Sequence, residues 1–292
     1  MLTDYHLHLR PDLREATAER YFTKERVACY RRAAQRAGIL DLGVSEHIYR
    51  FKEALAVWDH PLWRESAVDD LERYCAFVKE AGLRLGIEAD YIPGREEQLA
   101  DLLARYPFDY VVGSVHFIPR QKKANPADPD SFASVDMEEY LIWREGEEPE
   151  RVWERYFQLV GEAARSGLFD LIGHPDLVKL FGPRPKASPA LLFAPALEGF
   201  LAGGVAAELS TAGLRKGLGE PYPSQPLLEA LVGAGVPIAL SSDAHEPDQV
   251  GYAYPQAVAA LKAAGAKGIA VFCGRRRGVL LLDVEERAGG SR

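Results

Sequence analysis

The sequence predicts a single-domain α/β protein whose parallel strands close into a barrel of the TIM type. Short apolar segments alternate with helical segments along the whole chain of 292 residues, and such strand–helix repeats give parallel strands with right-handed crossovers. Seven or eight of these units fit within about 250 residues, the usual size of a closed barrel. Glycine, which adopts the left-handed conformation that ends many helices, follows five of the helical segments, at Gly38, Gly82, Gly167, Gly235 and Gly265. A doubly wound open sheet is the alternative.

The predicted strands and helices follow one another with little interruption. The strands are short apolar runs, in chain order Leu2–Leu7, Leu40–Ser45, Leu83–Glu88, Tyr110–Val115, Leu168–Gly173, Val205–Ser210, Val236–Ser241 and Gly268–Cys273. The helices show the helical spacing of apolar residues, in chain order Lys24–Ala37, Ser66–Ala81, Glu96–Arg105, Glu150–Ser166, Pro189–Ala202, Gln225–Ala234 and Pro255–Ala264.

Two long insertions break this alternation, at residues 49–65 and 117–149. Both begin just after the carboxyl end of a predicted strand, where barrel enzymes build their pockets. Loops of this length are usually functional or disordered, so we expect a lid or specificity role, with surface decoration as the alternative. We expect one domain over residues 1–284 and a frayed tail over residues 285–292.

Composition and charge narrow the classes of function. A net charge of −8 argues against broad nucleic-acid binding, which normally leaves a basic footprint, but a small phosphorylated substrate remains compatible. The three cysteines are far apart and odd in number, as expected for reduced thiols of a cytoplasmic protein. The first residues lack the pattern of a signal peptide, and no apolar run reaches transmembrane length.

The chain begins with a pattern typical of a metal site. In D-Y-H-L-H, Asp4, His6 and His8 alternate along a predicted strand, so their side chains point to the same face. Histidines and acids also follow the other predicted strands, in the segments S-E-H, G-I-E-A-D, G-S-V-H, I-G-H-P-D and S-S-D-A-H. Because the carboxyl ends of barrel strands meet at one rim, these residues are expected to become neighbours.

A cluster of this kind predicts bound metal ions. Without cations, so many buried imidazoles and carboxylates would suffer desolvation and mutual repulsion. Eight residues are strong candidate ligands: His6, His8, His47, Glu88, His116, His174, Asp243 and His245. A catalytic zinc usually takes three protein ligands, so two or three divalent ions are expected, with Glu88 bridging a pair. The mixture of imidazole and carboxylate suits zinc, iron or manganese. His60 lies inside an insertion and is expected at the surface or in a lid.

These motifs resemble, in order and across nearly the whole chain, the metal motifs of the PHP (polymerase and histidinol phosphatase) superfamily. The segments G-I-E-A-D-Y-I, G-S-V-H-F, I-G-H-P-D-L-V-K and T-A-G-L-R-K resemble its histidinol-phosphate phosphatases in particular. The resemblance implies a distorted (β/α)7 barrel with three metal ions. One ion would be held by His6, His8, Glu88 and Asp243, and a second by Glu88, His116 and His174. The third would be held by His47, His245 and a residue after His8. Relatives often place a histidine there, and this chain offers Asp12, or Glu15 as the alternative.

The resemblance also implies how a substrate would be bound. Relatives use basic residues to hold phosphate, and the matching positions are Lys179, where relatives often have arginine, and Arg215. Asp243 or His245 would relay a proton to the leaving oxygen. A substrate amine could pair with one of three acids, Asp90, Asp176 or Glu208, although each could instead orient a ligand histidine.

The expected function is therefore hydrolysis of L-histidinol phosphate, in histidine biosynthesis, by a metal-dependent phosphatase. Three alternatives stay open: a PHP phosphatase acting on another small phosphoester, a PHP-type exonuclease, and a metal-binding module without catalysis. The sequence leaves the oligomeric state open.

Overall fold

The computed structural model describes residues 2–13, 15–120 and 125–282. The tail expected over residues 285–292 lies outside this part of the chain. Seven parallel strands form one sheet in the order β1-β2-β3-β4-β7-β8-β9. Their bounds are β1 Leu2–Asp4, β2 Ile39–Val44, β3 Arg84–Asp90, β4 Tyr110–Ser114, β7 Leu171–Ile172, β8 Ala206–Ser210 and β9 Ile238–Ser241.

The sheet curls until its first and last strands meet. A parallel bridge joins Leu7 to Ala244, and the backbone N–H of His8 donates to the carbonyl of Ala244 at 2.7 Å. The side chain of Asp4 accepts hydrogen bonds from the backbone and the hydroxyl of Ser242. The molecule is therefore a nearly closed seven-stranded α/β barrel, as the sequence predicts, and the open-sheet alternative is wrong.

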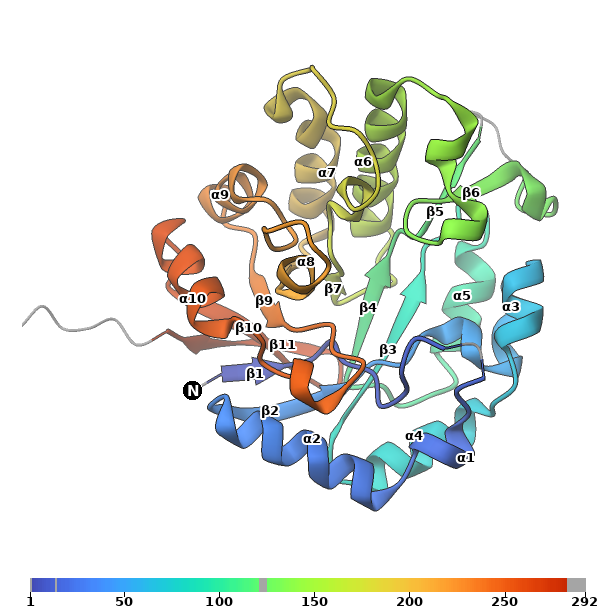
Figure 1. The fold of residues 1–292 in the computed structure, drawn as a ribbon, viewed down its shortest axis with the longest axis vertical. Helices are drawn as coiled ribbons and strands as arrows, with labels where there is room; N and C mark the ends of the chain where they lie inside the picture. The colour runs from blue at the N-terminus through green and yellow to red at the C-terminus, as the bar shows by residue number, and fades with distance from the viewer. Residues whose placement is uncertain (1, 14, 121–124, 283–292) are drawn as a thin grey trace, which may run out of the picture.

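Helices surround the strands (Figure 1). The α-helices are α1 Ala18–Tyr21, α2 Lys24–Arg36, α3 Pro61–Ser66, α4 Leu71–Glu80, α5 Glu96–Leu103, α6 Pro149–Arg165, α7 Pro189–Gly203, α8 Ala212–Arg215, α9 Gln225–Gly233 and α10 Tyr254–Ala263. All five glycines expected to end helices have positive φ. None of the helices in the described part of the chain has the length and apolar character that crossing a membrane requires.

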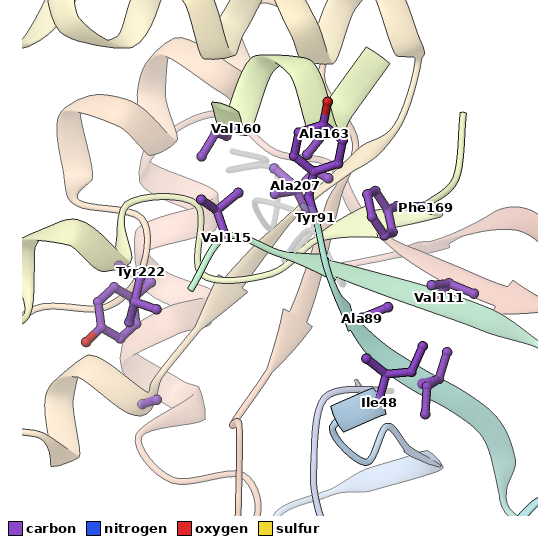
Figure 2. Close-up of a cluster of buried hydrophobic side chains, with 14 of the residues drawn as sticks. Ile48, Ala89, Tyr91, Val111, Val115, Val160, Ala163, Phe169, Ala207 and Tyr222 are labelled. Carbon is purple, nitrogen blue, oxygen red and sulfur yellow. The ribbon is translucent and has the colours of Figure 1, made fainter. Parts of the chain in front are cut away.

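Alternation along the strands separates the hydrophobic core from the barrel interior. On β3, Leu85, Ile87 and Ala89 point outward into the core beneath the helices, whereas Glu88 lies between them and points inward. Figure 2 shows part of this outer core, in which Ala89 belongs to the same buried cluster as Val160 of α6. Because the outer layer is apolar, the polar side chains gather inside the barrel.

The eighth predicted strand forms but does not join the barrel. It is β10 (Gly268–Cys273), which pairs antiparallel with β11 (Arg276–Leu281). The two residues between these strands, Gly274 and Arg275, have φ of 55° and 60°, as a tight hairpin turn requires. Phe272 packs with Tyr110 in a second cluster. The Tyr110 ring fills the space beside Gly86, where an added Cβ would lie 2.2 Å from it.

The described parts of both insertions are folded, and they contact each other. The first contains α3 and two short 3-10 helices, η1 Ile48–Arg50 and η2 Lys52–Ala56. The second contains a hairpin of β5 (Phe117–Pro119) and β6 (Phe132–Ser134), followed by η4 Glu138–Tyr140 and η5 Ile142–Glu145; η3 Pro129–Ser131 precedes β6. Trp58 packs edge-on against Phe117 and Phe132, with ring centroids 5.0 and 5.4 Å apart. Elsewhere, the 3-10 helices η6 Leu177–Lys179 and η7 Pro247–Gln249 follow β7 and β9.

His60 is buried, so its expected place at the surface is wrong. Only 2% of its surface is exposed. Its Nδ1 accepts a hydrogen bond from the backbone N–H of Leu62 at 3.2 Å, which caps α3, and its ring stacks on Trp58 at 4.3 Å. The ring also lies 5.1 Å from that of Phe117 and 5.2 Å from that of Tyr140, both in the second insertion, so His60 joins the two insertions as a structural residue.

Candidate metal centre

Six histidines, one glutamate and one aspartate meet at the carboxyl end of the barrel. The eight residues are His6, His8, His47, Glu88, His116, His174, Asp243 and His245, and all are buried except the partly buried His245. They come from six segments at strand ends that lie far apart in the sequence. The structure thus brings together all eight strong candidates.

Glu88 lies at the centre of this group. Its Oε2 lies 3.3 Å from His6 Nε2, 3.5 Å from His8 Nε2 and 2.5 Å from His47 Nδ1. Its Oε1 lies 3.1 Å from His174 Nε2 and 3.5 Å from His116 Nε2. One carboxylate therefore faces histidines on both sides, which is the position that a bridging ligand needs.

The spacing of the ligand atoms fits metal ions. Ligand atoms about 2.1 Å from a tetrahedral ion lie about 3.4 Å from one another. The atoms of His6 and His8 lie 3.3 to 3.8 Å from the nearest oxygens of Glu88 and Asp243. In three overlapping groups, one ligand atom from each residue lies within 4.8 Å of the others. The groups are His6–His8–Asp243, His6–Glu88–His174 and His8–His47–His245.

Several buried atoms of the cluster also lack a hydrogen-bond partner among the described residues. They are His6 Nε2, both ring nitrogens of His8, Glu88 Oε2, His174 Nδ1 and His245 Nε2. Buried polar atoms normally have partners, and an unpaired one costs about 1–3 kcal/mol. Divalent ions would satisfy the atoms of this group that face Glu88 and Asp243, which are His6 Nε2, His8 Nε2 and Glu88 Oε2. The donor set therefore fits the metals that its chemistry suggests.

Two further carboxylates orient the histidines. Glu208 Oε1 lies 2.7 Å from His6 Nδ1, and Asp90 Oδ1 lies 2.7 Å from His116 Nδ1. Each contact turns the opposite nitrogen, Nε2, toward Glu88, as in the carboxylate–histidine pairs of metal proteins. Of the two roles considered for these acids, the geometry supports orientation of a histidine.

The electrostatics of the cluster are strongly perturbed. Burial lowers the pKa of His6, but Glu208 and Glu88 outweigh it and raise the pKa well above its ordinary value. Burial and the neighbouring His245 and His47 hold the pKa of His8 well below its ordinary value. Adjacent imidazoles thus shift in opposite directions, because the charges are crowded where water cannot screen them.

Two candidate ligands have strained backbones. His174 and Asp243 have φ of 27° and 49°, in a region that residues other than glycine seldom adopt. Glu208 Oε2 accepts the backbone N–H of His174 at 2.5 Å, and Arg215 donates to the carbonyl of Asp243 at 2.8 Å. Such strain gathers at functional sites, where surrounding contacts hold it in place.

A cavity of about 360 Å³ opens above the cluster. His47, His116, His174, Asp243 and His245 form part of its wall. Segments of both insertions complete it, through Tyr49 and Leu62 of the first and residues 136–140 of the second. A small molecule in the cavity would contact the candidate metal ligands directly.

Asp12 lines this cavity but belongs to none of the three groups. Its carboxylate is 73% exposed and lies 3.4 Å from Arg50. The ring of His8 stacks between those of His47 and His245, with centroid distances of 4.2 and 4.1 Å, and these three histidines form one of the groups. Glu15, the alternative, is exposed.

The two residues expected to hold phosphate do not line the cavity formed by the described residues. Lys179 is 2% exposed and pairs with Asp176 at 2.9 Å, while its ammonium also donates to the carbonyl of Pro221. Arg215 donates to the backbone carbonyls of Ser242 and Asp243. Both charges are engaged with neighbouring loops in this structure.

Sequence reasoning missed two residues that do line the cavity, Lys216 and Asp136. Lys216 Nζ lies 3.4 Å from Asp243 Oδ2, and Asp136 Oδ2 lies 4.0 Å from His116 Nε2. Lys216 could have been found as the neighbour of Arg215 in T-A-G-L-R-K. Nothing in the sequence indicates that Asp136 lines the cavity, because it lies in a long insertion without a recognisable motif.

Comparison with known proteins identifies the family. A model of the PHP domain matches residues 21–212. The chain belongs to the PHP domain family. This PHP protein is 33% identical over 249 residues to the "Probable histidinol-phosphatase" of Deinococcus radiodurans, an alignment that covers 82% of this chain and 88% of the relative. It is 29% identical over 190 residues to the histidinol-phosphatase of Bacillus subtilis, covering 60% and 68% of the two chains.

A solved structure shares the fold of this PHP protein. The histidinol phosphate phosphatase of Lactococcus lactis, complexed with zinc, L-histidinol and phosphate, superposes with a TM-score of 0.68 at 18% identity. The superposition covers 95% of this chain and 98% of that one. The family and the fold expected from the motifs are therefore confirmed.

Proposed function

We propose that this PHP protein is a metal-dependent phosphatase that hydrolyses L-histidinol phosphate to L-histidinol and phosphate. The main support is that a buried carboxylate, Glu88, faces five histidines, three of which line a cavity that also contains a lysine. The names of the Deinococcus and Bacillus relatives support the choice of substrate. The Lactococcus protein with the same fold was crystallised with zinc and both reaction products.

The proposed ligands form three sets. His6, His8, Glu88 and Asp243 would hold one ion. Glu88, His116 and His174 would hold a second. His47 and His245 would hold a third, together with Asp12 if its exposed carboxylate turns inward, because His8 Nε2 faces the ligands of the first ion. When bound, the ions supply positive charge for the phosphoryl group and lower the pKa of water toward neutrality.

The protein's own residues bind and orient the substrate. Lys216 places an ammonium at the cavity wall beside Asp243, where it can neutralise charge on the phosphoryl oxygens. Arg215 fixes the backbone of Asp243 and so sets the position of that carboxylate. His245 also lines the cavity, and its Nε2, which has no hydrogen-bond partner among the described residues, can act either as a ligand of the third ion or as the proton donor to the leaving oxygen, but not as both at once. Asp243 is the less suitable donor, because its oxygens already face His6, His8 and Lys216.

We also propose that the protein acts on a small phosphoester, and not on a nucleic acid, as a single domain in the cytoplasm. Four acids, Asp12, Asp136, Glu138 and Glu139, line the cavity, and their charge would repel a nucleic acid. We assign the whole of residues 1–284 to one catalytic domain, with the insertions at 49–65 and 117–149 forming the cavity rim. The three free cysteines suit a reducing cytoplasm.

Phosphate release tests the proposal. The purified protein should hydrolyse histidinol phosphate with a kcat/KM at least tenfold above that for a panel of general phosphomonoesters. Chelation should remove the activity, and return of zinc, iron or manganese should restore it. Equal rates across the panel would remove the specific substrate. Degradation of labelled single-stranded DNA at a comparable rate would favour the exonuclease alternative.

A further inference from the structure

We infer that Asp136 binds the ammonium group of the substrate and so makes the cavity selective for phosphoesters of amino alcohols with the amine beside the ester-bearing carbon. The inference rests on the proposed phosphatase function, and it names the recognition element of the same site. It concerns a residue in the second insertion, outside the metal motifs of the barrel.

The position of Asp136 is fixed by the backbone around it. Asp136 follows β6, whose last residue, Ser134, donates its hydroxyl to Asp136 Oδ1 at 2.9 Å. The same hydroxyl oxygen accepts the backbone N–H groups of Asp136 and Met137. Between them, Val135 N–H donates to the carbonyl of His116 at 2.9 Å. The carboxylate is thus tied to the strand end that carries a proposed metal ligand.

One oxygen of this carboxylate is available to a ligand. Oδ1 is held by Ser134, whereas Oδ2 faces the cavity, 4.0 Å from His116 Nε2. The side chain is 19% exposed, so it is partly shielded from water but can be reached from the cavity. An ion pair in such a place is screened less than one at the surface.

The other acids near the cluster are already engaged. Asp90 pairs with His116 Nδ1, and Glu208 pairs with His6 and with the backbone of His174. Asp176 pairs with Lys179 and accepts the backbone N–H of Ser224, away from the cavity. These were the three acids that the sequence offered for a substrate amine. Asp176 Oδ1 has no hydrogen-bond partner among the described residues, but none of the three acids lines the cavity.

The distance from the metal centre also selects Asp136. In histidinol phosphate the amine is borne by the carbon next to the one that carries the phosphate ester, so the ammonium lies close to the phosphoryl group. A carboxylate beside His116 is within reach of such an ammonium when the phosphate contacts the metal ions and Lys216. Glu138 is farther out: its side chain is 84% exposed and pairs with Arg144 at 2.7 Å.

The cavity wall leaves an apolar place for the rest of the substrate. Leu13, Tyr49, Leu62 and Met137 line it together with the acids. An imidazole ring can pack against such a surface. The contact between Asp136 and the ammonium group would then determine the orientation of the substrate in the cavity.

Asp136→Asn tests the inference with two substrates, histidinol phosphate and its deamino analogue, imidazolylpropyl phosphate. Asparagine keeps the shape and the acceptor for Ser134 but removes the charge. Loss of a charge-assisted contact should lower kcat/KM for histidinol phosphate tenfold to a hundredfold. The value for the deamino analogue should change less than about threefold, because that substrate has no ammonium to lose. Binding of the product L-histidinol, measured by calorimetry, should weaken by a similar factor.

Glu138→Gln is the matched control, because it removes one negative charge from the same cavity wall. It should leave the ratio of the two kcat/KM values unchanged. If the ratio of kcat/KM for histidinol phosphate to that for the deamino analogue fell equally in Asp136→Asn and Glu138→Gln, the total charge of the cavity rim, and not Asp136, would recognise the amine. Equal losses on both substrates in Asp136→Asn, with loss of metal by elemental analysis, would make Asp136 part of the metal centre and overturn the inference.

The wild-type protein separates this inference from the proposed function. If it hydrolyses both substrates equally well, the ammonium contact is disproved while the phosphatase stands. If it hydrolyses neither, the proposed function itself fails.

Discussion

Neighbouring residues at the C-terminal end of α8 perform different tasks at the cavity. Arg215 turns away from the cavity and binds two backbone carbonyls, whereas Lys216 lines the wall beside Asp243. Burial lowers the pKa of Lys216, but Asp243, Asp136 and Asp12 outweigh it and raise the pKa. Lys216 therefore stays charged where a phosphoryl group would lie.

Lys216→Ala should weaken the binding of phosphate. We expect kcat/KM for histidinol phosphate to fall tenfold to a hundredfold, since a hydrogen bond to a charged group contributes about 1.5–3 kcal/mol. Inhibition by inorganic phosphate should weaken by a comparable factor in steady-state assays. Lys262→Ala, which removes an exposed charge from α10, is the control. Unchanged phosphate inhibition in Lys216→Ala would contradict the assignment.

Asp243→Asn should abolish turnover while the fold persists. Its Oδ1 lies 3.5 Å from His8 Nε2 and 3.8 Å from His6 Nε2, and an amide is a poorer metal ligand than a carboxylate. We expect kcat/KM to fall more than about a hundredfold, with an unchanged circular dichroism spectrum. Asp248→Asn, an exposed acid on the same loop, should leave the kinetics intact. Near-normal turnover in Asp243→Asn would contradict the ligand assignment.

His60 gives the folded protein a pH dependence outside the metal centre. Burial lowers its pKa to about 4 from the ordinary 6.5, so the unfolded chain binds the proton more readily. As the pH falls from 6.5 toward 4, this residue destabilises the folded state. Protonation of Nδ1 also removes the hydrogen bond that this atom accepts from the backbone N–H of Leu62 at the start of α3.

His60→Asn keeps a capping side chain and removes the titration. Allowing for screening by solvent, we expect the free energy of unfolding of the wild type to fall by about 1 kcal/mol more than that of the variant between pH 7.5 and pH 5. Denaturant unfolding of both proteins at the two pH values measures the difference. Parallel losses would show that His60 has an ordinary pKa.

At the scale of elements, helices α6 and α7 pack with their backbones in contact. A Cβ added at Gly199 would lie 2.3 Å from the carbonyl oxygen of Gly161, and one added at Gly161 would lie 2.2 Å from that of Pro195. Backbone atoms cannot move aside as a flexible side chain can. Glycine at these positions therefore permits the close approach of the two helices.

Gly199→Ala should destabilise the protein, although alanine is the better helix former. Overpacking costs about 1–3 kcal/mol, which exceeds the gain of about 1 kcal/mol in helix propensity. Gly233→Ala, in α9, is the matched control: no atom lies within 4 Å of its added Cβ, so it should be neutral or stabilising. Denaturant unfolding gives both values, and a stabilised Gly199→Ala variant would disprove the close contact.

Helices and strands could be predicted from the sequence where the local spacing of apolar residues determines them. Apolar runs and helical spacing located the seven barrel strands, and α2 begins at the predicted Lys24. The pairing of the eighth predicted strand, β10, could not be predicted, because its partner β11 is formed by the residues that follow it. The burial of His60 was hidden for a similar reason: it depends on Trp58 and Tyr140, which come from two different insertions.

At the scale of the molecule, the barrel explains why most of the candidate site could be predicted. Residues that end parallel strands must share one rim, so strand-end histidines become neighbours whatever the loops do. Loop residues follow no such rule. Lys179 and Arg215 were expected in the cavity but hold loops together, while Asp136 enters it from an insertion whose course no motif reveals.

The central claim is that side chains from distant segments hold a shared group of metal ions around Glu88. Anomalous X-ray scattering from crystals of the purified protein, collected at the absorption edges of zinc, iron and manganese, tests it most directly. We predict two or three peaks within bonding distance of His6, His8, Glu88 and the other proposed ligands. Anomalous maps that are flat around Glu88, from protein that retains full phosphatase activity, would contradict the account.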